Sequence, residues 1–173
     1  MADVQVLLTN QSVLLPQTLL KVSVIAPVKI FALILSDNDK VLSHENVVCE
    51  ENTKIPGVEL NGNEIIIVPS TLQERVGKIV FVAVCVGGDK LADLDGIEVF
   101  MSAKPLNAKF MPLFLKDANA IVLCSMVKSL RSWRLIMDGS RFDDGLLGVG
   151  KEFGFDSKEL AGKFKSLFFL KRQ

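Results

Sequence analysis

The chain has 173 residues, and its 20 basic and 20 acidic side chains give zero net charge at neutral pH. Zero net charge excludes the strong basic field of most nucleic-acid-binding proteins, so no nucleic-acid partner is expected. It also leaves little electrostatic repulsion between copies. Because 49% of the residues are hydrophobic, the chain must bury much apolar surface, and self-association or a protein partner is expected.

Length and segment composition predict one soluble, cytoplasmic domain. The longest apolar runs, such as Ile79–Val86 and Ile65–Val68, are far shorter than the roughly 20 residues of a membrane-spanning helix. The first residues lack a basic region followed by an apolar one, so no secretion signal is predicted. The three cysteines are too few and too widely spaced for a disulfide framework. They are Cys49, Cys85 and Cys124.

The first half of the chain reads as short strands. Leu19–Ile25 alternates, which places Leu20, Val22 and Val24 on one face. Lys29–Leu35 is almost continuously apolar, so both of its faces are expected to be covered. A hairpin turn is predicted at Ser36–Lys40. Further strands are expected at Val4–Leu8, Val13–Leu15, Val41-Leu42 and Val47–Cys49, and Glu50–Gly57 is expected to be a polar connection.

A second group of strands follows a hairpin signal at Asn61-Gly62-Asn63, which stands between the apolar runs Val58–Leu60 and Glu64–Val68. Pro69-Ser70-Thr71 is predicted to open a helical turn over Leu72–Val76. Later strands are expected at Lys78–Val86, Ile97–Ser102, Met111–Leu115, Ala120–Val127 and Ser132–Met137. Strands at this spacing predict an all-β-dominated fold, a two-sheet β-sandwich.

The C-terminal part is predicted to form short helices. Gly145–Phe153 reads as one helix, and Asp156 with Glu159 resembles the capping pattern of a second. Leu160, Phe164, Leu167 and Phe168 then form one apolar stripe. We therefore expect a β-sandwich domain over residues 1–155 and an amphipathic helix over residues 156–173, docked on that domain or on a partner.

Three aromatic residues of this helix are candidates for partner binding. They are Phe164, Phe168 and Phe169. One helical stripe cannot bury both members of the Phe168-Phe169 pair equally, and an exposed remainder would form a contact surface. Packing into the core is the alternative for each of them.

No pattern of catalytic residues is present, so the protein is predicted not to be an enzyme. The only histidine, His44, lies in a polar stretch, and the G-x-S-x-G motif of serine hydrolases is absent. His44 and the scattered cysteines lack the paired spacing of a zinc site. Gly145, Gly148 and Gly150 have the wrong spacing for a dinucleotide motif, and close packing of a helix explains them better.

Acidic residues form three small groups, at Asp37/Asp39, Asp93–Gly96 and Asp143-Asp144. Calcium takes six to eight oxygen ligands, several of them carboxylates. Each group offers two or three carboxylates at most, so a solvated turn is the simpler interpretation. Asp93 and Asp95 remain weak metal candidates, and no metal or other cofactor is expected.

A series of segments stands out by its order and spacing: Ala32–Val41, Ser43–Asn52, Pro56–Asn63, Glu64–Val68, Lys78–Val86, Trp133–Leu135 and Gly145–Gly154. In this order and spacing they resemble the TerD family, whose members are tellurium-resistance and general stress proteins. The resemblance implies a β-sandwich that acts as a non-catalytic binding or scaffold module in a stress response. The alternative that it leaves open is a module that binds a small ligand, either a divalent cation or a cyclic nucleotide.

The chain departs from the family at the residues that bind calcium there. The family's D-x-D-A-S motif corresponds to Pro27–Phe31, and its acidic G-D-G-D-D-E loop is missing after Asn63. Only Asn61, Asn63 and Glu64 remain as possible ligand remnants, and turn formation explains them. We therefore predict that high-affinity calcium binding is lost.

Overall fold

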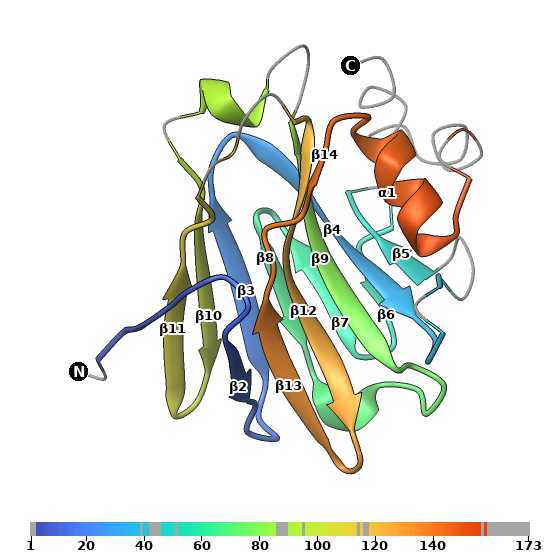
Figure 1. Ribbon diagram of the computed structural model, residues 1–173. Coiled ribbons are helices and arrows are strands. Elements are labelled where there is room, and N and C mark those ends of the chain that lie inside the picture. The colour runs from blue at the N-terminus through green and yellow to red at the C-terminus, as the bar shows by residue number, and fades with distance from the viewer. Residues whose placement is uncertain are drawn as a thin grey trace.

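The computed structural model describes residues 3–38, 40–41, 46–50, 52–85, 90–94, 96–113, 115, 118–156 and 158. These residues form two β-sheets that face each other, with one α-helix against the outer side of one sheet (Figure 1). The architecture confirms the predicted two-sheet sandwich. None of the helices in the described ranges is long and apolar enough to cross a membrane.

The two sheets, here called sheet I and sheet II, each contain seven strands. Sheet I has the order β1 (Gln5–Leu7), β11 (Leu106–Phe110), β10 (Glu98–Ala103), β3 (Leu20–Ile25), β8 (Glu64–Ile67), β7 (Val58–Asn61) and β6 (Lys54–Ile55). Sheet II has the order β2 (Ser12–Leu14), β13 (Ser132–Met137), β12 (Ala120–Ser129), β9 (Lys78–Cys85), β4 (Val28–Leu35) and β5 (Val47–Val48), with β14 (Arg141–Phe142) beside β12. The helix α1 spans Leu146–Phe153.

Strands β3 and β4 show why the residue patterns lead to this arrangement. In β3 the alternating residues Leu20, Val22 and Val24 are buried between the sheets, as predicted. In β4 both faces are covered, also as predicted: Ile30 packs between the sheets and Phe31 packs on the outer side of sheet II. A strand buried on both faces requires a continuous apolar sequence, which β4 has from Ile30 to Leu35.

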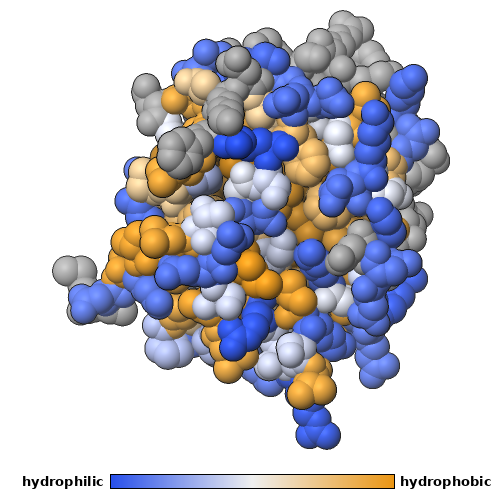
Figure 2. Space-filling model, in the orientation of Figure 1, coloured by the Kyte–Doolittle hydropathy of each residue, from blue (hydrophilic) through white to orange (hydrophobic). Residues whose placement is uncertain are grey.

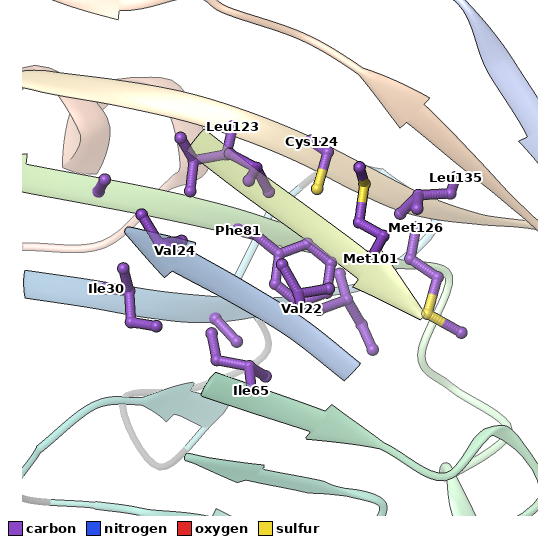
Figure 3. Close-up of a cluster of buried hydrophobic side chains, with 14 of the residues drawn as sticks. Val22, Val24, Ile30, Ile65, Phe81, Met101, Leu123, Cys124, Met126 and Leu135 are labelled. Carbon is purple, nitrogen blue, oxygen red and sulfur yellow. The ribbon is translucent and has the colours of Figure 1, made fainter. Parts of the chain in front are cut away.

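The main core lies between the two sheets. Phe81 of β9 is 1% exposed and lies beside Val22 of β3 and Met101 of β10 (Figure 3). Cys85 and Cys124 are also buried in this cluster. The core therefore draws side chains from strands that are distant in the sequence.

A second apolar cluster fixes α1 to the outer side of sheet II. A Cβ atom at Gly150 would lie 2.6 Å from the carbonyl oxygen of Phe155, so the chain after the helix packs directly on this glycine. Gly154 adopts φ +78° and its N–H donates to the carbonyl oxygen of Gly150 at 2.8 Å, which ends the helix. Close packing is thus the role of Gly150, as predicted.

The N-terminal segment contributes an edge strand to each sheet. β1 pairs with β11 in parallel, and β2 pairs with β13 antiparallel. Three apolar side chains of this segment, Val4, Val6 and Leu8, remain exposed. Figure 2 shows apolar surface gathered on the side of the molecule where this segment lies.

Two elements differ from the prediction. The prediction of a strand at Met111–Leu115 is wrong. The strand in this region is β11, Leu106–Phe110, which pairs with β10 across the Lys104-Pro105 turn. Its polar residues Asn107 and Lys109 alternate with buried ones, which made it less conspicuous than the apolar residues after it.

The helical turn is the second difference. It covers Pro69–Thr71 as a 3₁₀ helix, and Leu72–Val76 is not helical. Two short strands, β6 and β14, were not predicted from the sequence.

The β7–β8 hairpin confirms the Asn-Gly signal. Asn61 and Glu64 are the last paired residues, so Gly62 and Asn63 form a two-residue loop. Gly62 has φ +64°, a conformation that favours glycine. The second C-terminal helix lies almost wholly outside the described residues, as do Phe164, Phe168 and Phe169.

Candidate functional site

A cavity of about 340 Å³ opens at one edge of the sandwich, between β4 of sheet II and the β7–β8 hairpin of sheet I. Its sheet II wall is formed by Val28–Phe31, four consecutive residues of β4. Leu60, Gly62 and Asn63 form the opposite wall, and Glu50 and Thr53 close it from the connection between β5 and β6. Its volume falls at the lower end of the range of ligand-binding clefts.

The cavity exists because two neighbouring strands differ in length. β4 pairs with β9 along all eight of its residues. On its other side β4 pairs with β5 only at Ala32 and Leu33. Beyond β5, Cys49 pairs with Asn52 in an isolated bridge, and the next strand, β6, belongs to sheet I. No strand among the described residues therefore lies beside Val28–Phe31.

One ion pair stands at the cavity. The ammonium nitrogen of Lys29 lies 2.5 Å from a carboxylate oxygen of Glu50, and the two side chains are 41% and 55% exposed. An ion pair this exposed contributes only about 0–1 kcal/mol to stability. The pair places one positive and one negative group at the cavity.

The structure brings together the two segments in which the sequence departs from the TerD family. Pro27–Phe31 contributes four of its five residues to one wall, and Asn63 belongs to the other. The remaining polar residues of the hairpin serve the fold: the Asn63 carbonyl oxygen accepts from the N–H of Val24 at 3.0 Å, and the Glu64 carboxylate accepts from the Ser23 hydroxyl at 3.1 Å. Asn61 pairs with Glu64 in the ladder.

The other metal candidates are dispersed. The Asp93 carboxylate accepts from the N–H of Lys90 at 3.0 Å and caps the 3₁₀ helix Leu91–Asp93. Asp95 and His44 lie outside the described residues. Within the described ranges, no three His, Cys, Asp or Glu side chains come together in a way that could hold a metal ion.

Asn119 is a buried polar residue that the sequence did not reveal. Its side-chain amide donates to the carbonyl oxygen of Asp143 at 3.1 Å, and its main chain bonds Phe142 and Cys85. These bonds fix the segment that leads into α1. Asn119 is therefore a structural residue, and it does not line the cavity.

The cysteines offer no activated thiol in the described structure. All three are buried. Burial raises the pKa of the Cys124 thiol, and the nearby negative charge of Asp138 raises it further. Because the thiolate is the nucleophilic form, Cys124 is an inert core residue.

Glu50, Thr53 and Ile30 were not predicted as site residues. The signal for them was a difference in length, since Lys29–Leu35 is a long apolar run and Val47–Cys49 a short one. Strands of unequal length leave part of the longer one without a neighbour. The sequence does not show, however, that these two runs pair with each other.

Two solved structures have a fold similar to that of this chain. The chain superposes on the crystal structure of SAV2460, a protein of unknown function, with a TM-score of 0.56 and 12% identity over 73% of this chain and 90% of that one. It superposes on a homologue of the telluride resistance protein TerD from Streptomyces coelicolor A3(2) with a TM-score of 0.53 and 10% identity, over 75% of this chain and 93% of that one.

Comparisons by sequence give no match. No family model matches the chain, and no curated protein matches it. The relationship therefore rests on architecture, and at identities this low it concerns the fold alone. At that level it agrees with the resemblance seen in the sequence: the chain has the two-sheet fold of a TerD homologue.

Proposed function

We propose that the chain is a non-catalytic binding module of the TerD type, which acts through protein contacts in a cytoplasmic stress response that includes tolerance of tellurium compounds. The fold shared with a TerD homologue is the observation that carries this proposal. Two further features support it. The cavity is lined by a strand edge and an ion pair, and the three cysteines are buried thiols, as suits a reducing compartment.

Expression of the chain in a tellurite-sensitive bacterial host tests the proposal. We expect the host to tolerate a higher tellurite concentration than cells with an empty vector. The variant Leu130→Ala is the control for a substitution outside the core and should give the same tolerance as the native chain. Leu130 is 94% exposed, so its replacement leaves the core intact. Equal tolerance with and without the chain, at equal amounts of folded protein, would contradict the proposal.

Binding of a divalent cation is the second candidate function, and the cavity argues against it. A cation there would meet the Lys29 ammonium group, and Glu50 is the only acidic side chain among the residues that line the cavity. We expect added calcium to leave the melting temperature of the native chain unchanged. A site occupied at a hundredfold excess over its Kd would instead stabilise the protein by about 2.7 kcal/mol.

The variant Lys29→Asp provides the contrast. The substitution removes a positive charge and places a second carboxylate beside Glu50, so the two negative charges repel. The stability of the variant is expected to fall, and to recover partly when calcium binds between the two carboxylates. Scanning calorimetry with and without calcium measures both effects. Isothermal titration that reveals a sub-micromolar calcium site in the native chain would show that the prediction is wrong.

A further inference from the structure

The cavity runs along the main-chain edge of β4. Successive side chains of a strand point to opposite faces, and here Val28 and Ile30 face the inter-sheet core while Phe31 faces the outer side of sheet II. A space that contacts all of Val28–Phe31 must therefore lie beside the backbone that these residues share. It occupies the position beside β4 that β5 would fill if β5 were longer, and we call this position the lane.

The hydrogen-bond phase of β4 shows which groups face this lane. In an antiparallel sheet, every other residue directs both its N–H and its C=O to the same neighbour. The N–H of Cys85, opposite Val28, donates to Asn119 on the far side of β9, and the N–H of Val28 donates to Ala26 at 2.9 Å. Val28, Ile30 and Ala32 are therefore in phase, and they direct their main-chain groups away from β9.

Ile30 is the residue left without a strand opposite it. Ala32 has Val48 of β5 as its partner. Ile30 is only 4% exposed, and in the described part of the chain no strand pairs with it on the cavity side. A main-chain donor and acceptor in such a place favour a partner that satisfies both. An extended backbone does so with a single residue.

We propose that this edge of β4 binds an extended peptide segment of a partner protein, which adds a short antiparallel strand in line with β5. The inference rests on the proposed function, for which it names the kind of partner and the place of contact. Binding by strand addition draws affinity from main-chain hydrogen bonds and specificity from alternate side chains. The register of β4 with β5 continues to Cys49 opposite Phe31, and Cys49 is buried. The open part of the lane beside Val28–Ile30 is therefore about 10 Å long at the rise of a β-strand, which accommodates three residues.

The residues that line the cavity determine which peptide sequence fits it. Its inward side chains would lie beside Val28, Ile30 and Leu60 and are expected to be apolar. The residue between them would face Lys29. An acidic side chain there forms a cross-strand pair with the ammonium group and releases Glu50 to water. The recognised pattern is therefore apolar–acidic–apolar in an extended segment.

Phage display against the full chain tests this. The library holds random octapeptides together with octapeptides that alternate apolar and acidic residues. We expect enrichment of the alternating class. In NMR spectra the selected synthetic peptide should shift the amide of Ile30 and slow its hydrogen exchange, and Glu50→Gln should strengthen binding of that peptide.

Two variants locate the contact. Ile30→Pro removes the N–H that points into the lane without removing a bond to β9, and proline is accepted at such edges. It is expected to weaken binding at least tenfold, whereas the matched control Ile30→Val retains it. Should Ile30→Pro fail to fold, Thr53→Trp blocks the cavity from an exposed position and serves the same purpose.

Other outcomes overturn the assignment. Selected peptides that bind the native chain and Thr53→Trp equally would place the site elsewhere, and a library that yields no binder would remove the peptide as the occupant. Protection of the Ile30 amide that rises with protein concentration alone would indicate a second copy. Tellurite tolerance that persists in a folded Ile30→Pro chain would leave the proposed function standing while this inference falls.

Discussion

Replacing Phe81 with alanine is expected to lower the free energy of unfolding by about 3–5 kcal/mol. Phe81 is 1% exposed and lies between the two sheets, beside side chains from both (Figure 3). Without the ring, the folded state loses the favourable free energy of transferring that ring from water into the core. A cavity also remains, because the paired strands on both sides cannot move together to close it. For a chain of this length the melting temperature should fall by roughly 6–20 °C.

The matched control is Phe100→Ala. Phe100 is half-buried on the outer face of sheet I, where the Lys109 ammonium group lies 5.5 Å from its ring centre. Its loss should cost about 1–2 kcal/mol at most, from partial burial and one cation–π contact. Urea denaturation of the two variants measures the difference. Equal losses would mean that the inter-sheet core is not the main source of stability.

Replacing Gly150 with alanine is the second change with a large expected effect. In an ordinary helix this change would stabilise by about 1 kcal/mol. Here the new methyl group would lie 2.6 Å from the Phe155 carbonyl oxygen, a backbone atom that cannot move alone. We expect a net loss of about 1–3 kcal/mol, because the segment after α1 must shift away from the helix.

Gly148→Ala in the same helix is its control. A Cβ atom at Gly148 would lie 3.2 Å from a ring carbon of the half-buried Phe142, a longer distance than the 2.6 Å at Gly150, and to a side chain rather than to the backbone. Its stability should change by less than about 1 kcal/mol. Thermal unfolding of both variants gives the comparison. A stability gain in Gly150→Ala would show that the close contact with Phe155 does not exist in solution.

The sequence predicted the sandwich because its central strands carry strong patterns. Alternation in β3 and the continuous apolar run of β4 reflect burial on one face and on two faces, respectively. β11 was displaced in the prediction because Asn107 and Lys109 interrupt its apolar residues, while the described residues of the more apolar segment after it, 111–113 and 115, are not in a strand. The hydrophobic pattern of a segment indicates which of its side chains are buried. It does not show where a strand begins and ends, because that depends on the strands with which it pairs.

The candidate site was less accessible from the sequence. The departures from the TerD pattern at Pro27–Phe31 and after Asn63 were visible, and the structure places these segments on facing walls. The strand edge at Ile30 was not visible, because it depends on where β5 ends relative to β4 and on the hydrogen-bond phase set by β9. Both are properties of pairing between segments, which no single segment encodes.

The N-terminal segment has a consequence for the order of assembly during synthesis. β1 leaves the ribosome early, yet its partner β11 begins about a hundred residues later, and β2 waits for β13 near residue 132. Until then neither edge strand has its neighbour, and Leu7, which is buried in the folded domain, stays accessible to other nascent chains. The N-terminal segment can therefore join the two sheets only after β11 and β13 have been synthesised.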